Sequence, residues 1–179
     1  MRVLVIGGAG SGKSAFAEKL ACGLSESRTY VATMARKGRE ARERIERHRQ
    51  QRAHLGFRTV ECADGSLEAG LRAADKTGVV LLDDLGNLLA NALFSLDGSM
   101  AKPQAVQDCL LREVVALCSG YSHAVVVGNL VGSEGLLADE YTLAWVRSMG
   151  ALCCGLAQEF DAVVEVVAGV PCVVKGDIA

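Results

Sequence analysis

The chain has 179 residues, half of which are hydrophobic, and a formal net charge of −2 at pH 7. This length predicts one globular domain over residues 1–179 that buries a full core. An aromatic content of 4% and a near-neutral charge argue against nucleic acid as a partner, because such a partner needs a basic face with stacking side chains. No run approaches the ~18 apolar residues of a membrane span, and no secretory leader is visible, so we expect a cytoplasmic protein that binds small molecules.

The first predicted element is a strand over residues 2–6, and a helix follows over residues 15–21. Between them the sequence fits the pattern G-x-x-x-x-G-K-[ST] with Gly7, Gly8, Ala9, Gly10, Ser11, Gly12, Lys13 and Ser14. The glycines let backbone N–H groups surround a polyphosphate, Lys13 supplies charge for its β- and γ-phosphates, and Ser14 supplies an oxygen ligand for Mg²⁺. The alternative is a glycine-rich turn without a ligand, but motif and context together favour a phosphate loop.

Strands and helices alternate along the remaining chain, with Ser66 as the expected N-cap of a short helix and Pro103 where a later helix begins. The predicted elements are strand 29–32, helix 38–53, strand 57–61, helix 66–75, strand 78–83, helix 85–94, helix 105–118, strand 123–127, helix 138–160, strand 162–167, turn 169–171 and strand 172–175. Such alternation predicts an α/β P-loop NTPase fold, with a mostly parallel sheet, helices on both faces and the ligand at the carboxyl ends of the strands.

Two adjacent carboxylates, Asp83 and Asp84, close the apolar run Gly78-Val79-Val80-Leu81-Leu82. An acid at the end of a buried strand in a P-loop fold reaches the metal of the nucleotide, which makes Asp83 the expected second half of the site. Asp84 is its rival for that role. A carboxylate in this position can instead cap the following helix, so one residue can serve each purpose.

The seven cysteines are an odd number and lack C-x-x-C spacing, which indicates neither a disulfide framework nor a zinc site. We expect buried thiols at Cys22, Cys62, Cys109, Cys118, Cys153, Cys154 and Cys172.

A charged helix predicted over residues 38–53 carries a histidine between two arginines. Arg44 and Arg52 lie four residues on either side of His48, so the three side chains share one helical face. The neighbouring cations favour the neutral imidazole, which is both a base and a nucleophile, while the arginines can hold phosphate. Without further context, a solvated surface histidine remains an alternative interpretation.

The spacing of these motifs resembles that of a known enzyme family. Besides the phosphate loop, the matching segments are Tyr30-Val31-Ala32-Thr33, Arg44-Ile45, His48-Arg49, Arg52, Thr59-x-Glu61, Leu81-Leu82-Asp83, Asn91-x-Leu93-Phe94 and Asn129-x-Val131-Gly132. The chain is similar to the bifunctional adenosylcobinamide kinase / adenosylcobinamide-phosphate guanylyltransferases of cobalamin nucleotide-loop assembly. The likeness covers nearly the whole chain, and the position of the histidine-bearing helix makes it specific.

The resemblance implies two reactions, phosphorylation of adenosylcobinamide with ATP or GTP and transfer of GMP from GTP through a covalent intermediate on His48. It implies His48 and Lys13 as catalytic residues, and Ser14 and Asp83 as ligands of Mg²⁺. The implied nucleotide-binding residues are those of the phosphate loop together with Thr33, Arg49, Gln50, Gln51, Arg52, Glu61 and Asp83. The family's usual assembly also implies a homo-oligomer, in particular a trimer.

The chain departs from the family pattern at several positions, one of them in the phosphate loop, but it keeps the residues expected to bind the triphosphate. Gly10 stands where the family usually has Arg, Leu130 replaces a glutamate, Ser148 replaces an aspartate, and Cys154 falls on an asparagine. We therefore expect intact nucleotide binding and an altered corrinoid side. Two alternatives follow, namely a diverged P-loop kinase for another small alcohol without guanylyl transfer, and a non-catalytic nucleotide-binding regulatory protein.

Overall fold

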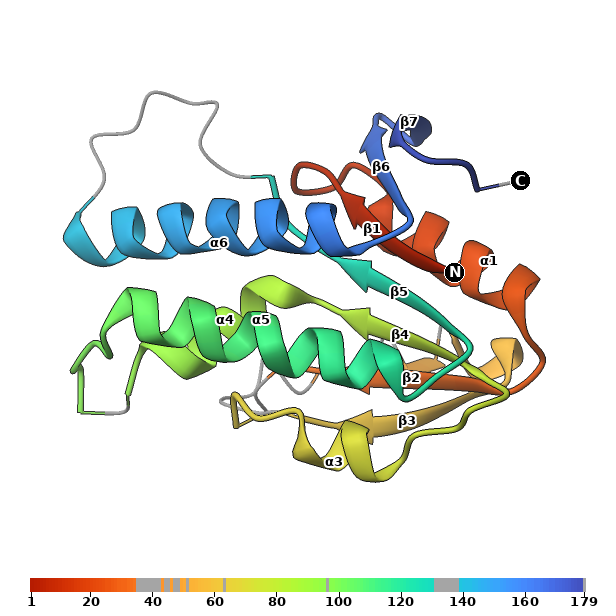
Figure 1. Ribbon diagram of the computed structural model, residues 1–179, viewed down its shortest axis with the longest axis horizontal. Helices are drawn as coiled ribbons and strands as arrows, with labels where there is room; N and C mark the ends of the chain where they lie inside the picture. The colour runs from red at the N-terminus through yellow and green to blue at the C-terminus, as the bar shows by residue number, and fades with distance from the viewer. Residues whose placement is uncertain are drawn as a thin grey trace.

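The computed structural model describes residues 1–34, 43, 46, 49, 50, 52–62, 64–95, 97–130 and 139–178. Its centre is a seven-stranded sheet in the order β3-β2-β4-β5-β1-β6-β7 (Figure 1). The strands are β1 (Arg2–Ile6), β2 (Arg28–Ala32), β3 (Phe57–Glu61), β4 (Val79–Asp83), β5 (His123–Val127), β6 (Ala162–Val167) and β7 (Val170–Lys175). Neighbouring strands pair in parallel except β7, which pairs antiparallel with β6. The predicted mostly parallel sheet is confirmed.

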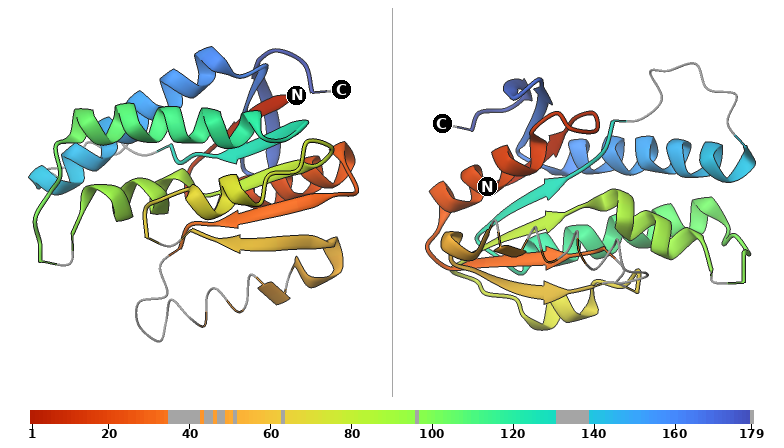
Figure 2. Two further views of the ribbon diagram at one scale, coloured as in Figure 1. Left: turned by 60° about the horizontal axis from the view of Figure 1, so that its bottom comes forward. Right: turned by 180° about the vertical axis from the view of Figure 1, so that it is seen from behind.

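Helices cover both faces of the sheet, as predicted (Figures 1 and 2). On one face lies α1 (Lys13–Leu24). The other face carries α3 (Glu68–Arg72), α4 (Leu85–Leu93), α5 (Pro103–Ser119) and α6 (Glu140–Glu159), while the short 3-10 helix η1 (Ala53–Leu55) leads into β3. The predicted helix over residues 38–53 lies largely outside the described residues, although Glu43, Glu46, Arg49, Gln50 and Arg52 are helical.

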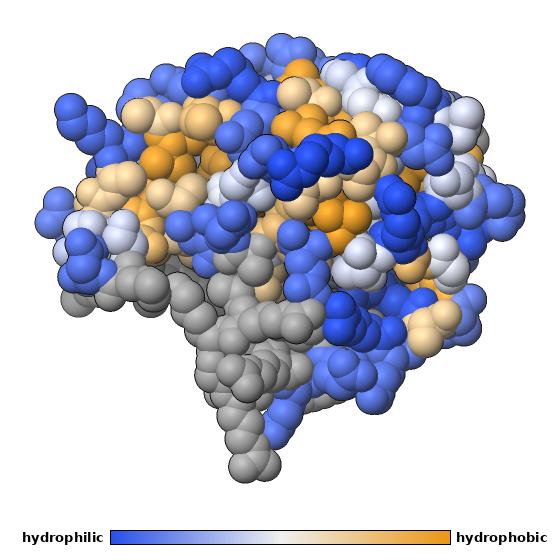
Figure 3. Space-filling model, turned by 90° about the horizontal axis from the view of Figure 1, so that it is seen from below, coloured by the Kyte–Doolittle hydropathy of each residue, from blue (hydrophilic) through white to orange (hydrophobic). Residues whose placement is uncertain are grey.

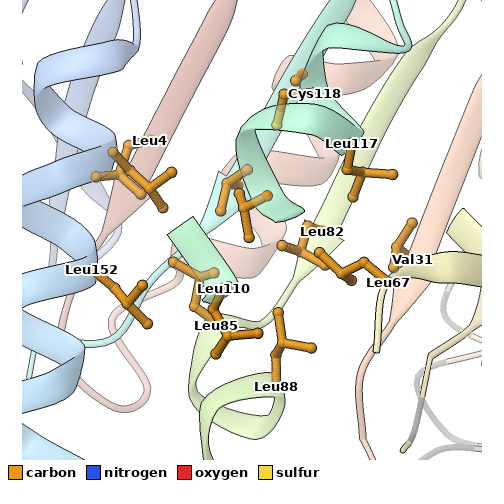
Figure 4. Close-up of a cluster of buried hydrophobic side chains, with 14 of the residues drawn as sticks. Leu4, Val31, Leu67, Leu82, Leu85, Leu88, Leu110, Leu117, Cys118 and Leu152 are labelled. Atoms are coloured by element: carbon orange, nitrogen blue, oxygen red, sulfur yellow. The ribbon is translucent and has the colours of Figure 1, made fainter. Parts of the chain in front are cut away.

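The core consists of two apolar clusters, one on each face of the sheet. Along β4, Val79 and Leu81 pack on the α1 side, whereas Val80 and Leu82 pack against the layer of α4, α5 and α6. Figure 4 shows Leu82 of this second cluster among leucines of the covering helices. Because β4 is buried on both faces, its sequence is a continuous apolar run rather than an alternating one, and each fully buried side chain contributes about 1.5–3 kcal/mol.

Several predicted boundaries are corrected by local backbone chemistry. The first helix begins at Lys13, two residues early, because Gly12 adopts the left-handed conformation with φ of 90° and serves as its N-cap. Helix α3 starts only at Glu68, so Ser66 is not its N-cap. The Ser66 hydroxyl instead accepts a hydrogen bond from the Glu68 N–H at 3.2 Å, ahead of the helix. Leu67 occupies the cap position instead, with its side chain buried in the core.

The last turn also differs from the prediction, because it ends before Val170 rather than covering residues 169–171. Ala168 and Gly169 have φ of 49° and 82°, as a two-residue hairpin turn requires, so β7 begins immediately afterwards. Pro171 then lies inside an edge strand, where its missing N–H can face away from the neighbouring strand.

Lys175 at the end of β7 donates three hydrogen bonds from Nζ to the carbonyl oxygens of Ala157, Gln158 and Phe160 at the C-terminal end of α6.

The prediction of buried thiols is correct for Cys62 and Cys118. It is wrong for Cys109, Cys154 and Cys172, which are exposed, while Cys22 and Cys153 are half-buried. The first two of these exposed thiols lie on the outer faces of α5 and α6, and the third lies in the edge strand β7, where a small side chain needs no core partner. All seven cysteines are free thiols.

On the face seen in Figure 3, hydrophobic side chains are exposed between hydrophilic ones, in keeping with the large apolar share of the composition. Among the described residues, no helix has the length and hydropathy needed to cross a membrane.

Candidate nucleotide site

The phosphate loop joins β1 to α1, and its glycines set its path. Gly10 and Gly12 have φ of 69° and 90°, values that side-chain-bearing residues rarely adopt. No side chain caps the first turn of α1, so its N–H groups can bind an anion. Lys13 is 9% exposed, and its Nζ donates to the Gly8 carbonyl at 3.1 Å. In this state the lysine folds back over its own loop.

A cleft of about 520 Å³ opens at the carboxyl ends of the central strands, beside the phosphate loop. Its walls come from the loop and α1, from the ends of β2, β4 and β5, and from α4 and α6. The lining residues are Ala9, Gly10, Lys13, Ser14, Tyr30, Ala32, Met34, Arg52, Asp83, Asp84, Gly86, Asn87, Ala90, Asn129 and Trp145.

Asp83 joins the phosphate loop to the end of β4 through its two carboxylate oxygens. The Ser14 hydroxyl donates to Oδ1 at 3.4 Å, and the Tyr30 hydroxyl donates to Oδ2 at 2.9 Å. Burial raises the pKa of Asp83, and the negative charge of Asp84 adds to that effect, whereas the hydrogen bonds from Tyr30 and Ser14 and the nearby Arg52 charge oppose it. The result is a buried carboxylate for which a nearby cation would be favourable.

The donor set around Asp83 fits Mg²⁺. A carboxylate and a hydroxyl, here 3.4 Å apart, are hard oxygen ligands, and Mg²⁺ commonly takes one or two of these together with water and phosphate oxygens. Asp83 and Ser14 are therefore the residues that would hold the ion.

Asp84 serves a different purpose from its neighbour. Its Oδ1 accepts from the Asn87 N–H at 2.8 Å and so caps α4, while Oδ2 accepts from Asn129 Nδ2 at 3.3 Å. Thr33 fixes its backbone, because the threonine hydroxyl donates to the Asp84 carbonyl at 2.7 Å and accepts from the Asp84 N–H at 3.0 Å. Of the two roles considered for the acids, the helix cap therefore falls on Asp84.

Arg52 brings a buried positive charge to the same cleft. It is 6% exposed, its guanidinium carbon lies 3.6 Å from the centre of the Tyr30 ring, and Nη1 lies 3.7 Å from Glu18 Oε1. Burial raises the pKa of Glu18, an effect that the Arg52 charge opposes. Nη1 of Arg52 is buried and has no hydrogen-bond acceptor among the described residues. An anion in the cleft could satisfy this donor.

The other implied nucleotide-binding residues lie in different surroundings. Thr33 is fully buried behind Asp84 and does not line the cleft. Arg49 Nη2 forms a 2.6 Å ion pair with Glu61 Oε1 at the end of β3, away from the cleft lining. Gln50 Nε2 donates to Glu46 Oε1 at 3.2 Å. Two implied residues, His48 and Gln51, lie outside the described residues, as does Arg44.

The positions that depart from the family pattern are also dispersed. Gly10 lines the cleft within the phosphate loop, Leu130 is 41% exposed, and Cys154 is exposed on α6. Ser148 is fully buried, and its hydroxyl accepts a 2.8 Å hydrogen bond from Gln107 Nε2 between α5 and α6. That substitution therefore contributes to helix packing rather than to the described cleft.

The cleft-lining residues that sequence reasoning did not assign to the site include Tyr30, Asn87, Asn129 and Trp145. Asn129 follows the strand that lies between β1 and β4, so a correct strand order would have placed it beside the acids. Tyr30 stands opposite Leu81, two positions from the pair of Ala32 with Asp83, and a tyrosine can reach a residue on that diagonal. Trp145 Nε1 donates to the Gly86 carbonyl at 3.2 Å, a contact between α6 and α4 that no local pattern indicates.

The fold and the loop define a P-loop nucleoside-triphosphate-binding protein. Solved structures with the same fold include an ATPase domain, with a TM-score of 0.55 and 14% identity over 92% of this chain and 68% of that one. Another is a Pyrococcus horikoshii OT3 protein solved as project PH0250, with a TM-score of 0.54 and 11% identity over 98% and 86% of the two chains. At these identities the likeness concerns the fold alone.

Sequence comparisons specify the family. Residues 3–174 match the family model described as cobinamide kinase / cobinamide phosphate guanyltransferase. The chain is 33% identical to the bifunctional adenosylcobalamin biosynthesis protein CobP of Pseudomonas aeruginosa, over 99% of both chains. It is 31% identical to the corresponding CobU protein of Salmonella typhimurium, over 98% and 100%. The chain belongs to this kinase / guanyltransferase family, and the resemblance inferred from the motifs is confirmed; it is an enzyme of the kinase and nucleotidyltransferase class.

Proposed function

We propose that this enzyme phosphorylates the aminopropanol hydroxyl of adenosylcobinamide with ATP or GTP, and then transfers GMP from GTP to the new phosphate. The observation that carries the proposal is the grouping of Lys13, Ser14 and Asp83 around one cleft in a chain that belongs to this family. The product is adenosylcobinamide-GDP. Both steps are displacements at phosphorus, and both need a polyphosphate held by the loop.

In the kinase step the protein contributes mainly position and charge. Lys13 moves from the Gly8 carbonyl to the phosphates, and the free donor of Arg52 takes another anionic oxygen. Mg²⁺ held by Ser14 and Asp83 supplies charge neutralisation on the triphosphate when bound. The hydroxyl oxygen of the acceptor forms the new bond to the γ-phosphorus, the bond to the β,γ-bridging oxygen breaks, and the hydroxyl proton is released.

In the second step neutral His48 is the proposed nucleophile. Its ring nitrogen bonds to the α-phosphorus of GTP while the bond to the departing pyrophosphate breaks. The phosphate of the acceptor then forms a bond to that phosphorus, and the nitrogen–phosphorus bond breaks, which returns the imidazole. Arg52 supports this placement, because it follows His48 by one helical turn in the sequence and reaches the cleft.

The covalent intermediate can be tested by radiolabelling. With Mg²⁺, label from α-labelled GTP should remain on the denatured protein in alkali and disappear in acid, as a phosphoramidate does, and γ-label should not be retained. His48→Ala should lose the label but keep measurable nucleotide binding. His54→Ala is the matched control, since His54 is exposed in η1 and should label normally.

Two results would contradict the guanylyltransferase proposal: absence of α-label on the wild-type protein, or equal labelling of His48→Ala. Turnover then separates the alternatives, because a diverged kinase would still consume nucleotide with an alcohol acceptor, whereas a regulatory protein would bind nucleotide without turnover. Calorimetry with adenosylcobinamide tests the altered corrinoid side. We also propose a homo-oligomer, with a trimer as the expected species in sedimentation analysis.

A further inference from the structure

Tyr30 is the side chain at which the charges of the candidate site meet. Its ring is 4% exposed, and Phe57 packs edge-on at 6.0 Å between ring centres. The hydroxyl donates to Asp83 Oδ2 at 2.9 Å, while Arg52 lies over the ring at 3.6 Å. None of the motifs used to identify the site assigns a role to this residue.

We propose that Tyr30 is a positioning residue for both charged groups, holding the Asp83 carboxylate toward Ser14 through its hydroxyl and the Arg52 guanidinium in the cleft through its ring. The inference rests on the proposed nucleotide site. It is independent of the corrinoid and of the guanylyl intermediate.

The hydroxyl fixes the rotation of the Asp83 carboxylate. A carboxylate at the end of a strand can rotate about its terminal bond, and the two oxygens then exchange places. With Oδ2 engaged by Tyr30, Oδ1 is the oxygen that faces Ser14 at 3.4 Å. The phenol is suited to this task, because its hydroxyl, on a rigid ring packed against Phe57, donates directly to Oδ2. Hydrogen bonds to charged acceptors are also stronger than neutral ones.

The Tyr30 ring holds the Arg52 guanidinium in place. A guanidinium stacked on an aromatic face gains a cation–π interaction, which strengthens when the pair is removed from water. Arg52 is nearly fully buried here, and Glu18 Oε1 lies 3.7 Å from Nη1 on the α1 side, which is beyond hydrogen-bond distance. Arg52 thus has the Tyr30 ring on one side and Glu18 on another. Arg52 lines the cleft, and its Nη1, which has no acceptor among the described residues, is the donor available to a phosphate oxygen.

Two variants separate the two functions of Tyr30. Tyr30→Phe removes the hydroxyl and keeps the ring, whereas Tyr30→Leu removes both. Tyr121→Phe is the matched control, because Tyr121 is also buried and donates its hydroxyl to the Gly70 carbonyl, in the apolar cluster on the opposite face of the sheet. GTP affinity is measured by calorimetry for each protein, with saturating Mg²⁺ and with EDTA. The magnesium factor is the dissociation constant for GTP in EDTA divided by that with saturating Mg²⁺, so a smaller factor means that Mg²⁺ strengthens GTP binding less.

For Tyr30→Phe we expect the magnesium factor to fall about tenfold while affinity in EDTA is unchanged, because only the carboxylate loses its alignment. For Tyr30→Leu, affinity in EDTA should also fall about tenfold, since Arg52 loses its support. Tyr121→Phe should match the wild type on both measures.

A second measurement needs no substitution at Tyr30. The chain has three tyrosines, so wild-type protein labelled with carbon-13 at tyrosine Cζ gives three signals, which Tyr121→Phe and Tyr141→Phe assign. Addition of Mg²⁺ to the GTP complex should shift the Tyr30 signal and leave the Tyr121 signal in place.

The proposal is overturned by an unchanged magnesium factor in Tyr30→Phe, by an equal fall in Tyr121→Phe, or by a stationary Tyr30 signal. Equal loss of affinity with and without Mg²⁺ in Tyr30→Phe would also overturn it, because a general loosening of the site predicts that result. If the wild type binds GTP normally and these results occur, the inference alone fails. If the wild type binds no GTP, the proposed function fails as well.

Discussion

Asp83 and Asp84 are chemically identical neighbours in the chain, and the structure gives them different partners. Asp83 is held by hydroxyl groups from β2 and α1 and lies in a buried setting. Asp84 is held by the backbone and side-chain amides of Asn87 and by the amide of Asn129, and it begins α4. The hydroxyl groups that donate to Asp83 come from other segments of the chain, whereas the hydrogen bond from the Asn87 N–H to Asp84 is part of the start of α4. The comparison teaches that the partners of a carboxylate, not its position in the sequence, determine its role.

Lys13→Ala should have the largest effect, because it removes the positive charge nearest to the loop on which both proposed reactions depend. We expect nucleotide-dependent turnover to fall below detection while the circular dichroism spectrum and unfolding midpoint stay close to those of the wild type. The turnover of this variant is the lower limit with which the turnover of the Asp83 and Asp84 variants is compared. Retained turnover with an unchanged KM would contradict the assignment of the phosphate loop.

Asp83→Asn and Asp84→Asn test the comparison directly. Asn keeps the shape at each position and is itself a good N-cap, so each substitution removes the charge and one acceptor oxygen. We expect Asp83→Asn to lower magnesium-dependent kcat/KM about a hundredfold or more and Asp84→Asn to lower it far less. Steady-state kinetics over a Mg²⁺ titration gives both values. Equal losses at the two positions would show that the acids share the metal.

Asp84→Ala should reveal the structural role of the second acid. Loss of an N-cap typically costs about 1 kcal/mol, which corresponds to about 2–4 °C in Tm for a chain of this size. Asp139→Ala provides the control, because Asp139 caps α6 through the Thr142 N–H at 2.9 Å and lies outside the cleft lining. Calorimetric unfolding should give similar losses for both variants. A much smaller loss at Asp84 would indicate that Thr33 and Asn129 can hold the start of α4 without the cap.

The smallest expected effect concerns pH and the ligand-free protein. Because the folded-state pKa of Asp83 is raised, the folded state holds its proton more tightly than the unfolded chain, so this group favours folding at low pH. Its contribution declines as pH rises from the unfolded value of about 4 through the raised folded value. Asp83→Asn should remove that decline and unfold at a slightly higher temperature than the wild type at neutral pH. Thermal unfolding across this pH range, without nucleotide or Mg²⁺, measures both effects.

The sequence predicted most of the fold because its signals were local. The apolar run before Asp83 and the glycines around Lys13 each act over a few residues, and the strands they predicted are present. The helix boundaries shifted where tertiary packing or a glycine conformation decided them, as at Leu67 and Gly12.

The site was harder to predict than the fold, because several of its contacts join segments that are far apart in the sequence. Tyr30 reaches Asp83 across 53 positions of the sequence, and Trp145 reaches Gly86 across 59. Neither contact follows from spacing or composition. The resemblance to the family supplied residues such as Thr33, but only the structure shows that its hydroxyl holds the backbone of Asp84 and is fully buried.

The position of β5 between β1 and β4 has a consequence for how the site responds to motion. Adjacent strands lie about 4.8 Å apart, so the backbones of β1, which leads into the loop, and β4, which ends in Asp83, are separated by about two such spacings. Backbone hydrogen bonds on both sides of β5 fix that separation. Hydrogen bonds in the middle of a sheet usually open only when the whole domain unfolds. The distance between the two halves of the cleft is therefore a property of the folded state as a whole, and nucleotide binding need not spend free energy to create it.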